Sequence, residues 1–254
     1  MVNNTEKHQV IIDSPILTYL CLVDSGALNN FVTDPIELDS VYIDLTYLSI
    51  LRTRGINVND FVREIFKFVV QLCSIREFHL ESNVKIFSYM HSVNSLPLFR
   101  NFSSATTTLT GSSGIEFLLF LHIAPKLKEV SVTLNYEKGN PLAHMTQSVV
   151  GALELLLNNL ECVNMSRLQG NNDEVELVGY ILKNAIVLNE LLMEVYVDGA
   201  FEDEDARVGK EFKFCKACFR LLTSSSMTRV MFSGQYLTAT NDTITSQNEI
   251  VLRI

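Results

Sequence analysis

A six-residue pattern, apolar-x-x-apolar-x-apolar, recurs along the chain and is clearest at Leu127–Val132. Further copies begin at residues 17, 38, 75, 160 and 188, and a degenerate copy begins near residue 102. Successive starts lie 21 to 37 residues apart. Much of that range fits a leucine-rich repeat of about 20–29 residues with occasional insertions. Each copy predicts a short strand whose three apolar side chains point into a shared core.

Helical periodicity fills the stretches between the copies. It predicts helices over 59–72, 114–122, 146–158 and 211–222. The spacing of Asp173 and Glu176 matches a capping box, so we expect a further helix from there to about Lys183. The acidic stretch 198–205 is expected to be a loop, and residues 227–232 repeat the strand pattern once more.

A unit made of one strand and one helix cannot bury its own helix face, so such units must stack. We therefore predict an α/β fold. It is a right-handed leucine-rich-repeat solenoid, or horseshoe, with a parallel β-sheet on the concave face and helices on the convex face. The repeats span residues 10–167, further repeats over 168–232 continue the solenoid, and the tail at 233–254 stays unassigned.

Composition narrows the function classes. The net charge of −9 argues against nonspecific nucleic-acid binding, which needs a basic patch, and favours a basic protein partner. No apolar run approaches 18 residues without a charge or break, so we expect no membrane span. With no secretory signal, the five cysteines are expected to be reduced thiols in an intracellular protein, cytoplasmic or nuclear.

One pair of residues has the spacing of a metal or redox site, Cys215 and Cys218. A structural zinc site needs two further ligands, and the other cysteines stand alone. Residues i and i+3 also share one face of a helix, so packing explains the pair equally well. A zinc site or a cysteine-dependent enzyme is the weaker alternative. We expect a non-enzymatic chain with no catalytic residue, no metal and no cofactor.

The repeat register points to a different kind of site. The third position of three copies is glutamate, and the next outward positions along the strands are mostly polar. The predicted face residues are Tyr42, Asp44, Glu77, His79, Glu81, Glu129, Ser131, Glu190 and Glu194. Because strand side chains alternate between faces, all should project from the concave surface. We hypothesise an acidic stripe that binds a basic partner segment. The alternative is that exposed strand positions are simply polar.

Residues 168–232 resemble the FBD domain of plant F-box/leucine-rich-repeat proteins. The resemblance rests on an ordered string: Leu168-Gln-Gly170, Glu174-x-Glu-Leu-Val178, Tyr180-Ile-Leu-Lys-Asn-Ala185, Val187-Leu188 and Glu211-Phe-Lys-Phe214. Upstream, Ile12–Leu17 and Ala124–Leu127 look like repeats of the same family. Together the matches cover roughly residues 10–232.

This resemblance implies capture of a protein target for a ubiquitin ligase. The family's F-box, a Leu-Pro-x-x-Leu-containing segment that docks on a Skp1-type adaptor, has no match in the sequence. Docking on that adaptor is therefore not expected from this chain, and the target itself is unknown. An autonomous scaffold, or a decoy that binds partners without delivering them, is the alternative.

Overall fold

The computed structural model describes most of the strands and the C-terminal third of the chain. The described residues are 10–12, 16–23, 31–33, 38–45, 75–82, 99–110, 118, 121, 123–135, 157–196, 203–222, 228–241 and 250–251. The helix predicted over 59–72 and most of the one over 146–158 lie outside these ranges. Of the helix predicted over 114–122, Leu118 and Leu121 are described, and both are helical and buried.

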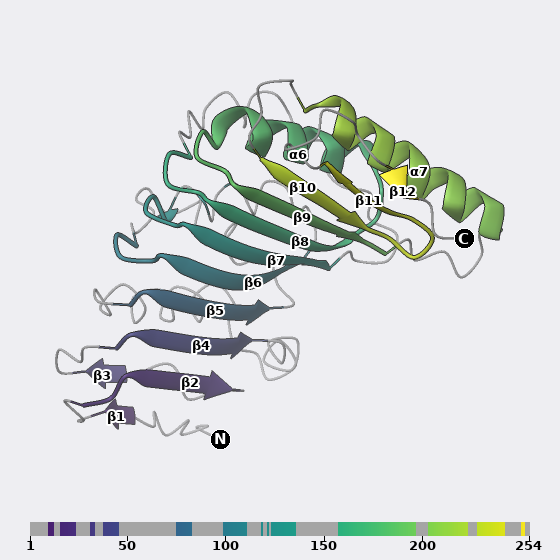
Figure 1. Ribbon diagram of the computed structural model, residues 1–254. Helices are drawn as coiled ribbons and strands as arrows, with labels where there is room; N and C mark the ends of the chain where they lie inside the picture. The colour runs from purple at the N-terminus through teal and green to yellow at the C-terminus, as the bar shows by residue number, and fades with distance from the viewer. Residues whose placement is uncertain are drawn as a thin grey trace, which may run out of the picture.

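The strands form one ten-stranded sheet and a separate parallel pair (Figure 1). The bounds in the large sheet are β2 (Tyr19–Val23), β4 (Ser40–Leu45), β5 (Glu77–Ser82), β6 (Ser104–Thr110), β7 (Glu129–Asn135), β8 (Cys162–Leu168), β9 (Glu190–Val195), β10 (Arg229–Ser233), β11 (Thr238–Asn241) and β12 (Ile250–Val251). The pair is β1 (Val10–Ile12) with β3 (Phe31–Thr33). In the large sheet β2 and β4 through β10 form a parallel array, in which each strand pairs in parallel with the next.

Each copy of the repeat pattern forms one strand of this parallel array. The degenerate copy near residue 102 is β6, and residues 227–232 lead into β10. In the clearest copy, Leu127, Val130 and Val132 are each at most 3% exposed. Side chains along β7 then alternate between buried and partly exposed positions. The predicted burial of the three apolar positions is confirmed. Its physical reason is that an extended strand turns successive side chains to opposite faces.

The core consists of rows of apolar side chains that run across the strands. One row contains Val41, Phe78, Ala105, Val130, Val163, Leu191 and Val230. The next contains Ile43, Leu80, Thr107, Val132, Met165, Met193 and Phe232. Phe78, Phe99 and Phe102 stack beneath β5, with ring centroids 4.6–6.3 Å apart. Every strand therefore depends on its neighbours for burial, as in a repeat protein.

Two helices pack on the core side of the sheet at its C-terminal end, as Figure 1 shows: α6 (Asn172–Asn184) and α7 (Glu204–Arg220). The expected capping box at Asp173 and Glu176 is wrong by two residues. Asn171 is the N-cap and Glu174 completes the box. Asparagine caps a helix as well as aspartate does. The helix begins at Asn172, which puts Glu174 at the third helical position, where it is buried and completes the box.

The last helix also begins earlier than its apolar pattern predicts. The predicted acidic loop at 198–205 ends in the first turn of α7, where Glu204 and Asp205 lie. Carboxylates in the first turn interact favourably with the helix dipole, which accounts for the helical geometry there. The unassigned tail contributes β11 and β12, which extend the sheet as antiparallel strands.

Candidate functional site

The side chains between the core positions form three rows on the sheet face opposite α6 and α7. We call this surface, on strands β2 to β10, the open face. The first row is Tyr19, Ser40, Glu77, Ser104, Glu129, Cys162, Glu190 and Arg229. The second is Cys21, Tyr42, His79, Thr106, Ser131, Asn164, Leu192 and Met231. The third consists of three sets in register: Val23, Asp44 and Glu81, then Thr108, Thr133 and Ser166, then Glu194 and Ser233.

All the residues predicted for a binding face lie in these rows. The register places Tyr42 beside His79 and Asp44 beside Glu81. It does not place the glutamates of the first row next to one another. Ser104 lies between Glu77 and Glu129, and Cys162 lies between Glu129 and Glu190. The acidic stripe is therefore a spaced row of carboxylates, and its role in binding stays a prediction.

One end of the open face carries a cluster of two rings and two carboxylates. The rings of Tyr42 and His79 have centroids 4.5 Å apart and are tilted by 33°. The imidazole Nε2 of His79 lies 3.2 Å from Oε1 of Glu81. Burial, followed by the charges of Glu81 and Asp44, raises the pKa of Tyr42 to about 12. The tyrosine hydroxyl is therefore a neutral donor in a negative environment.

The centre of the open face is acidic as well. Cys162 lies between Glu129 and Glu190 in the first row. Burial raises the pKa of the Cys162 thiol, and the charges of Glu190 and Glu129 raise it further. Both carboxylates therefore act on the same point of the surface, although a strand separates them.

Two basic side chains, Arg76 and Lys128, lie one position before β5 and β7 and are engaged there. There the backbone ladder continues, with Arg76 N–H donating to the Asp39 carbonyl and Glu161 N–H to the Lys128 carbonyl. The side chains pair too. Arg76 Nε lies 3.1 Å from Asp39 Oδ1, and Lys128 Nζ lies 3.0 Å from Glu161 Oε1. Within the described ranges Glu77, Glu129 and Glu190 make no ion pair. The first row of the open face, with three glutamates and Arg229, therefore keeps a net negative charge.

Some residues of the open face were not among the predicted ones. Tyr19 and Cys162 hold the third position of their own repeat copies, so the repeat register placed them in the glutamate row from the start. The prediction favoured charged positions and therefore left out Tyr19 and Cys162. Arg229, next to Glu190 in the register, is the basic residue of the first row.

Cys215 and Cys218 lie on the buried side of α7. Burial is the main cause that raises the pKa of each thiol to about 12. The charge of Glu211 adds to it at Cys215, and those of Cys215 and Glu174 add to it at Cys218. Both thiols therefore stay protonated near pH 7, whereas a nucleophile or a zinc ligand must be a thiolate. Across the described ranges no three metal-binding side chains come together.

Two buried glutamates bind backbone N–H groups where strands end. Glu174 of α6 is 2% exposed and accepts hydrogen bonds of 2.7–3.1 Å from the N–H groups of Gln169, Gly170 and Asn171, after β8. Glu211 of α7 is 0% exposed. It accepts hydrogen bonds of 2.8–3.1 Å from the N–H groups that follow β10, those of Gln235, Tyr236 and Leu237. These carboxylates hold the C-terminal loops in place, which is a structural role.

None of the helices that the structure describes has the length and apolar character needed to cross a bilayer.

Comparison with known proteins finds similarity to plant sequences. A family model described as FBD matches residues 148–193. This match overlaps the N-terminal part of the FBD-like string. An F-box/FBD/LRR-repeat protein of Arabidopsis thaliana is 30% identical over 207 residues, covering 80% of this chain and 43% of the relative. F-box/LRR-repeat protein 13 of the same plant is 28% identical over 224 residues, covering 86% and 47%.

Another F-box/FBD/LRR-repeat protein of Arabidopsis thaliana is 26% identical over 207 residues, covering 80% of this chain and 42% of the relative. The chain thus spans less than half the length of these curated relatives. No solved structure matches the chain significantly.

Proposed function

Because the chain belongs to the plant family of F-box/FBD/LRR-repeat proteins, we propose that it is a protein-interaction module whose open face binds a basic segment of a partner protein. The observation that carries this proposal is the row of Glu77, Glu129 and Glu190 on the open face, where within the described ranges none of the three makes an ion pair. Complementary charge across an interface steers association and selects the partner.

We also propose that the complete set of repeats forms a right-handed solenoid. In it the open face would be the concave surface and the helices would line the convex one. In the large sheet the parallel strands lie in the order in which they occur along the chain, β2 and then β4 through β10, which supports this arrangement. A curved sheet would surround an extended partner segment and bring several carboxylates to it at once.

The same proposal assigns the chain no enzymatic chemistry of its own. The protonated state of the Cys215 and Cys218 thiols supports this, because the pKa of each is raised to about 12. We also propose an intracellular location, which the free thiols of Cys21, Cys162, Cys215 and Cys218 support.

The names of the relatives contain the term F-box, which links the proposal to SCF-type ubiquitin ligases. In that setting the chain would supply the part that recognises the substrate. A pull-down in which a Skp1-type adaptor co-purifies supports this role. A pull-down that captures the partner without the adaptor supports a scaffold or decoy.

Charge reversal on the open face tests the proposed interaction. The bait is this chain, used for affinity capture from plant tissue, with Glu129→Lys/Glu190→Lys as the variant. We expect at least about a ten-fold loss of affinity for the captured partner, because like charges then face each other. The salt dependence of binding should also become weaker, since fewer opposite charges remain to be screened.

The control is Glu176→Lys/Glu204→Lys, which changes the net charge equally at exposed positions of α6 and α7. It should bind the partner like the unchanged chain. If the open-face variant binds as tightly as the control, the partner is recognised elsewhere and the proposal fails.

A further inference from the structure

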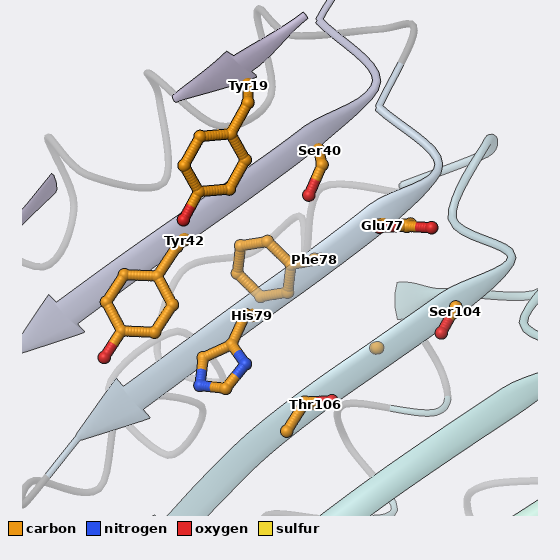
Figure 2. Close-up of a pocket in the computed structure, with 9 residues that line it drawn as sticks. Tyr19, Ser40, Tyr42, Glu77, Phe78, His79, Ser104 and Thr106 are labelled. Atoms are coloured by element: carbon orange, nitrogen blue, oxygen red, sulfur yellow. The ribbon is translucent and has the colours of Figure 1, made fainter. Parts of the chain in front are cut away.

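The open face contains a hollow of about 220 Å³ over strands β2, β4, β5 and β6. Figure 2 shows its lining: the phenol rings of Tyr19 and Tyr42 lie on one side and the carboxylate of Glu77 on the other. Ser40, Ser104 and Thr106 add hydroxyl groups to the lining. The volume is below the roughly 300–1,000 Å³ of pockets that hold whole small molecules. It suits a single side chain.

The aromatic part of the hollow is held in position by neighbouring groups. Tyr42 lies against the ring of His79, and Nε2 of His79 lies 3.2 Å from Oε1 of Glu81. Tyr19 is 53% exposed, so its ring remains available to a ligand. A fixed ring beside an exposed ring presents aromatic surface that costs little to order when a ligand binds.

The charge of the hollow is negative. Glu77 is exposed and makes no ion pair within the described ranges, in contrast to the paired Asp39 one position before β4. Asp44 and Glu81 act on Tyr42 from the third row. Among the described residues that line the hollow there is neither lysine nor arginine, and His79 faces the carboxylate of Glu81. A cation that enters would therefore meet carboxylate and aromatic groups.

We propose that this hollow binds an arginine side chain of the partner segment, with the guanidinium against the tyrosine rings and paired with Glu77. The proposal rests on the proposed function and names the partner residue that the open face selects. Arginine fits better than lysine because its flat guanidinium stacks on aromatic rings, pairs with carboxylates through two N–H groups and is weakly hydrated. Its three-carbon stem also lets it reach past the rim hydroxyls from an extended backbone.

The test uses short synthetic peptides and the intact chain. One peptide has a single central arginine flanked by serines. The other has citrulline, which keeps the shape and removes the charge. Binding is followed by NMR through the ring resonances of Tyr42 and His79. We expect the arginine peptide to bind at least about five-fold more tightly than the citrulline peptide.

Matched variants locate the binding. Glu77→Gln should weaken binding of the arginine peptide about five-fold, and Tyr42→Leu should weaken it as well. Glu77 is exposed, so its variant tests the hollow even if the Tyr42 variant folds poorly. Glu176→Gln on α6 should leave the affinity unchanged.

Three results would overturn the inference: equal affinity for both peptides, no binding of the arginine peptide, or a loss with Glu129→Gln as large as that with Glu77→Gln. The last result would mean that the peptide senses the charge of the whole row and ignores the hollow. None of them decides the proposed function, which is judged by charge reversal with the captured protein.

Discussion

Replacing Gly234 by alanine is expected to destabilise the chain by about 3 kcal/mol. A Cβ atom at this position would overlap the carboxylate of Glu211, which is fully buried. That carboxylate cannot move freely, because it accepts hydrogen bonds from the N–H groups of Gln235, Tyr236 and Leu237. Alanine would therefore displace the carboxylate and break the loop between β10 and β11. Urea unfolding, followed by circular dichroism, measures the change in free energy.

A double-mutant cycle separates this clash from other effects of the substitution. In a Glu211→Ala background the obstructing carboxylate is gone, so Gly234→Ala should cost less than about 1 kcal/mol further. Gly209→Ala is the control, since a Cβ there meets no atom within 4 Å. It lies inside α7 and should stabilise the chain by about 0.5–1 kcal/mol. Additive costs for Gly234 and Glu211 would contradict this account.

Replacing Glu174 by alanine should cost about 3–4 kcal/mol. The substitution leaves the N–H groups of Gln169, Gly170 and Asn171 without their acceptor and removes half of the capping box of α6. Glutamine at position 174 should cost less, about 1–2 kcal/mol, because it keeps one acceptor oxygen. The same urea experiment measures both variants.

Glu176→Ala is the matched control for Glu174, two residues along the same helix and exposed. Its effect should stay within about 0.5 kcal/mol. Equal losses at positions 174 and 176 would mean that helix propensity, and not the buried hydrogen bonds, sets the stability here.

These two glutamates give a physical reason for the FBD-like string. The stretch Leu168–Gly170, Glu174 and Glu211 all belong to it. In the structure they form a buried acceptor with its donors after β8, and the acceptor for the loop after β10. Only Gly170 in that stretch needs unusual backbone geometry, with φ at 73°. The string thus specifies how glutamates of α6 and α7 hold the loops that follow β8 and β10. This role is structural and separate from partner binding.

Much of the sheet could be predicted from spacing alone. The pattern at Leu127–Val132 places three side chains in the core and turns Glu129 and Ser131 outward, because strand side chains alternate. Since parallel copies align position by position, the same spacing predicts which side chains share a row, as Tyr42 and His79 do.

Other features depend on contacts that a linear pattern does not contain. The cap at Asn171 instead of Asp173 follows from the burial of Glu174 against the loop after β8. The short strand β11 pairs antiparallel with β10, and β12 pairs antiparallel with β11. The β11 segment is mostly polar and β12 has only two residues, so neither has a strand pattern of its own. The hollow beside Tyr19 depends on the sizes of side chains from four strands, which no single repeat specifies.

The central claim is that the partner lies on the open face. Hydroxyl-radical footprinting of the chain with its captured partner tests this directly, because it reports the solvent access of individual side chains. The account predicts that bound partner lowers oxidation of Tyr42, Leu192 and Met231, which lie in the second row. Oxidation of Phe212, exposed on α7, should not change. Protection of Phe212 with undiminished oxidation of the second row would contradict the account.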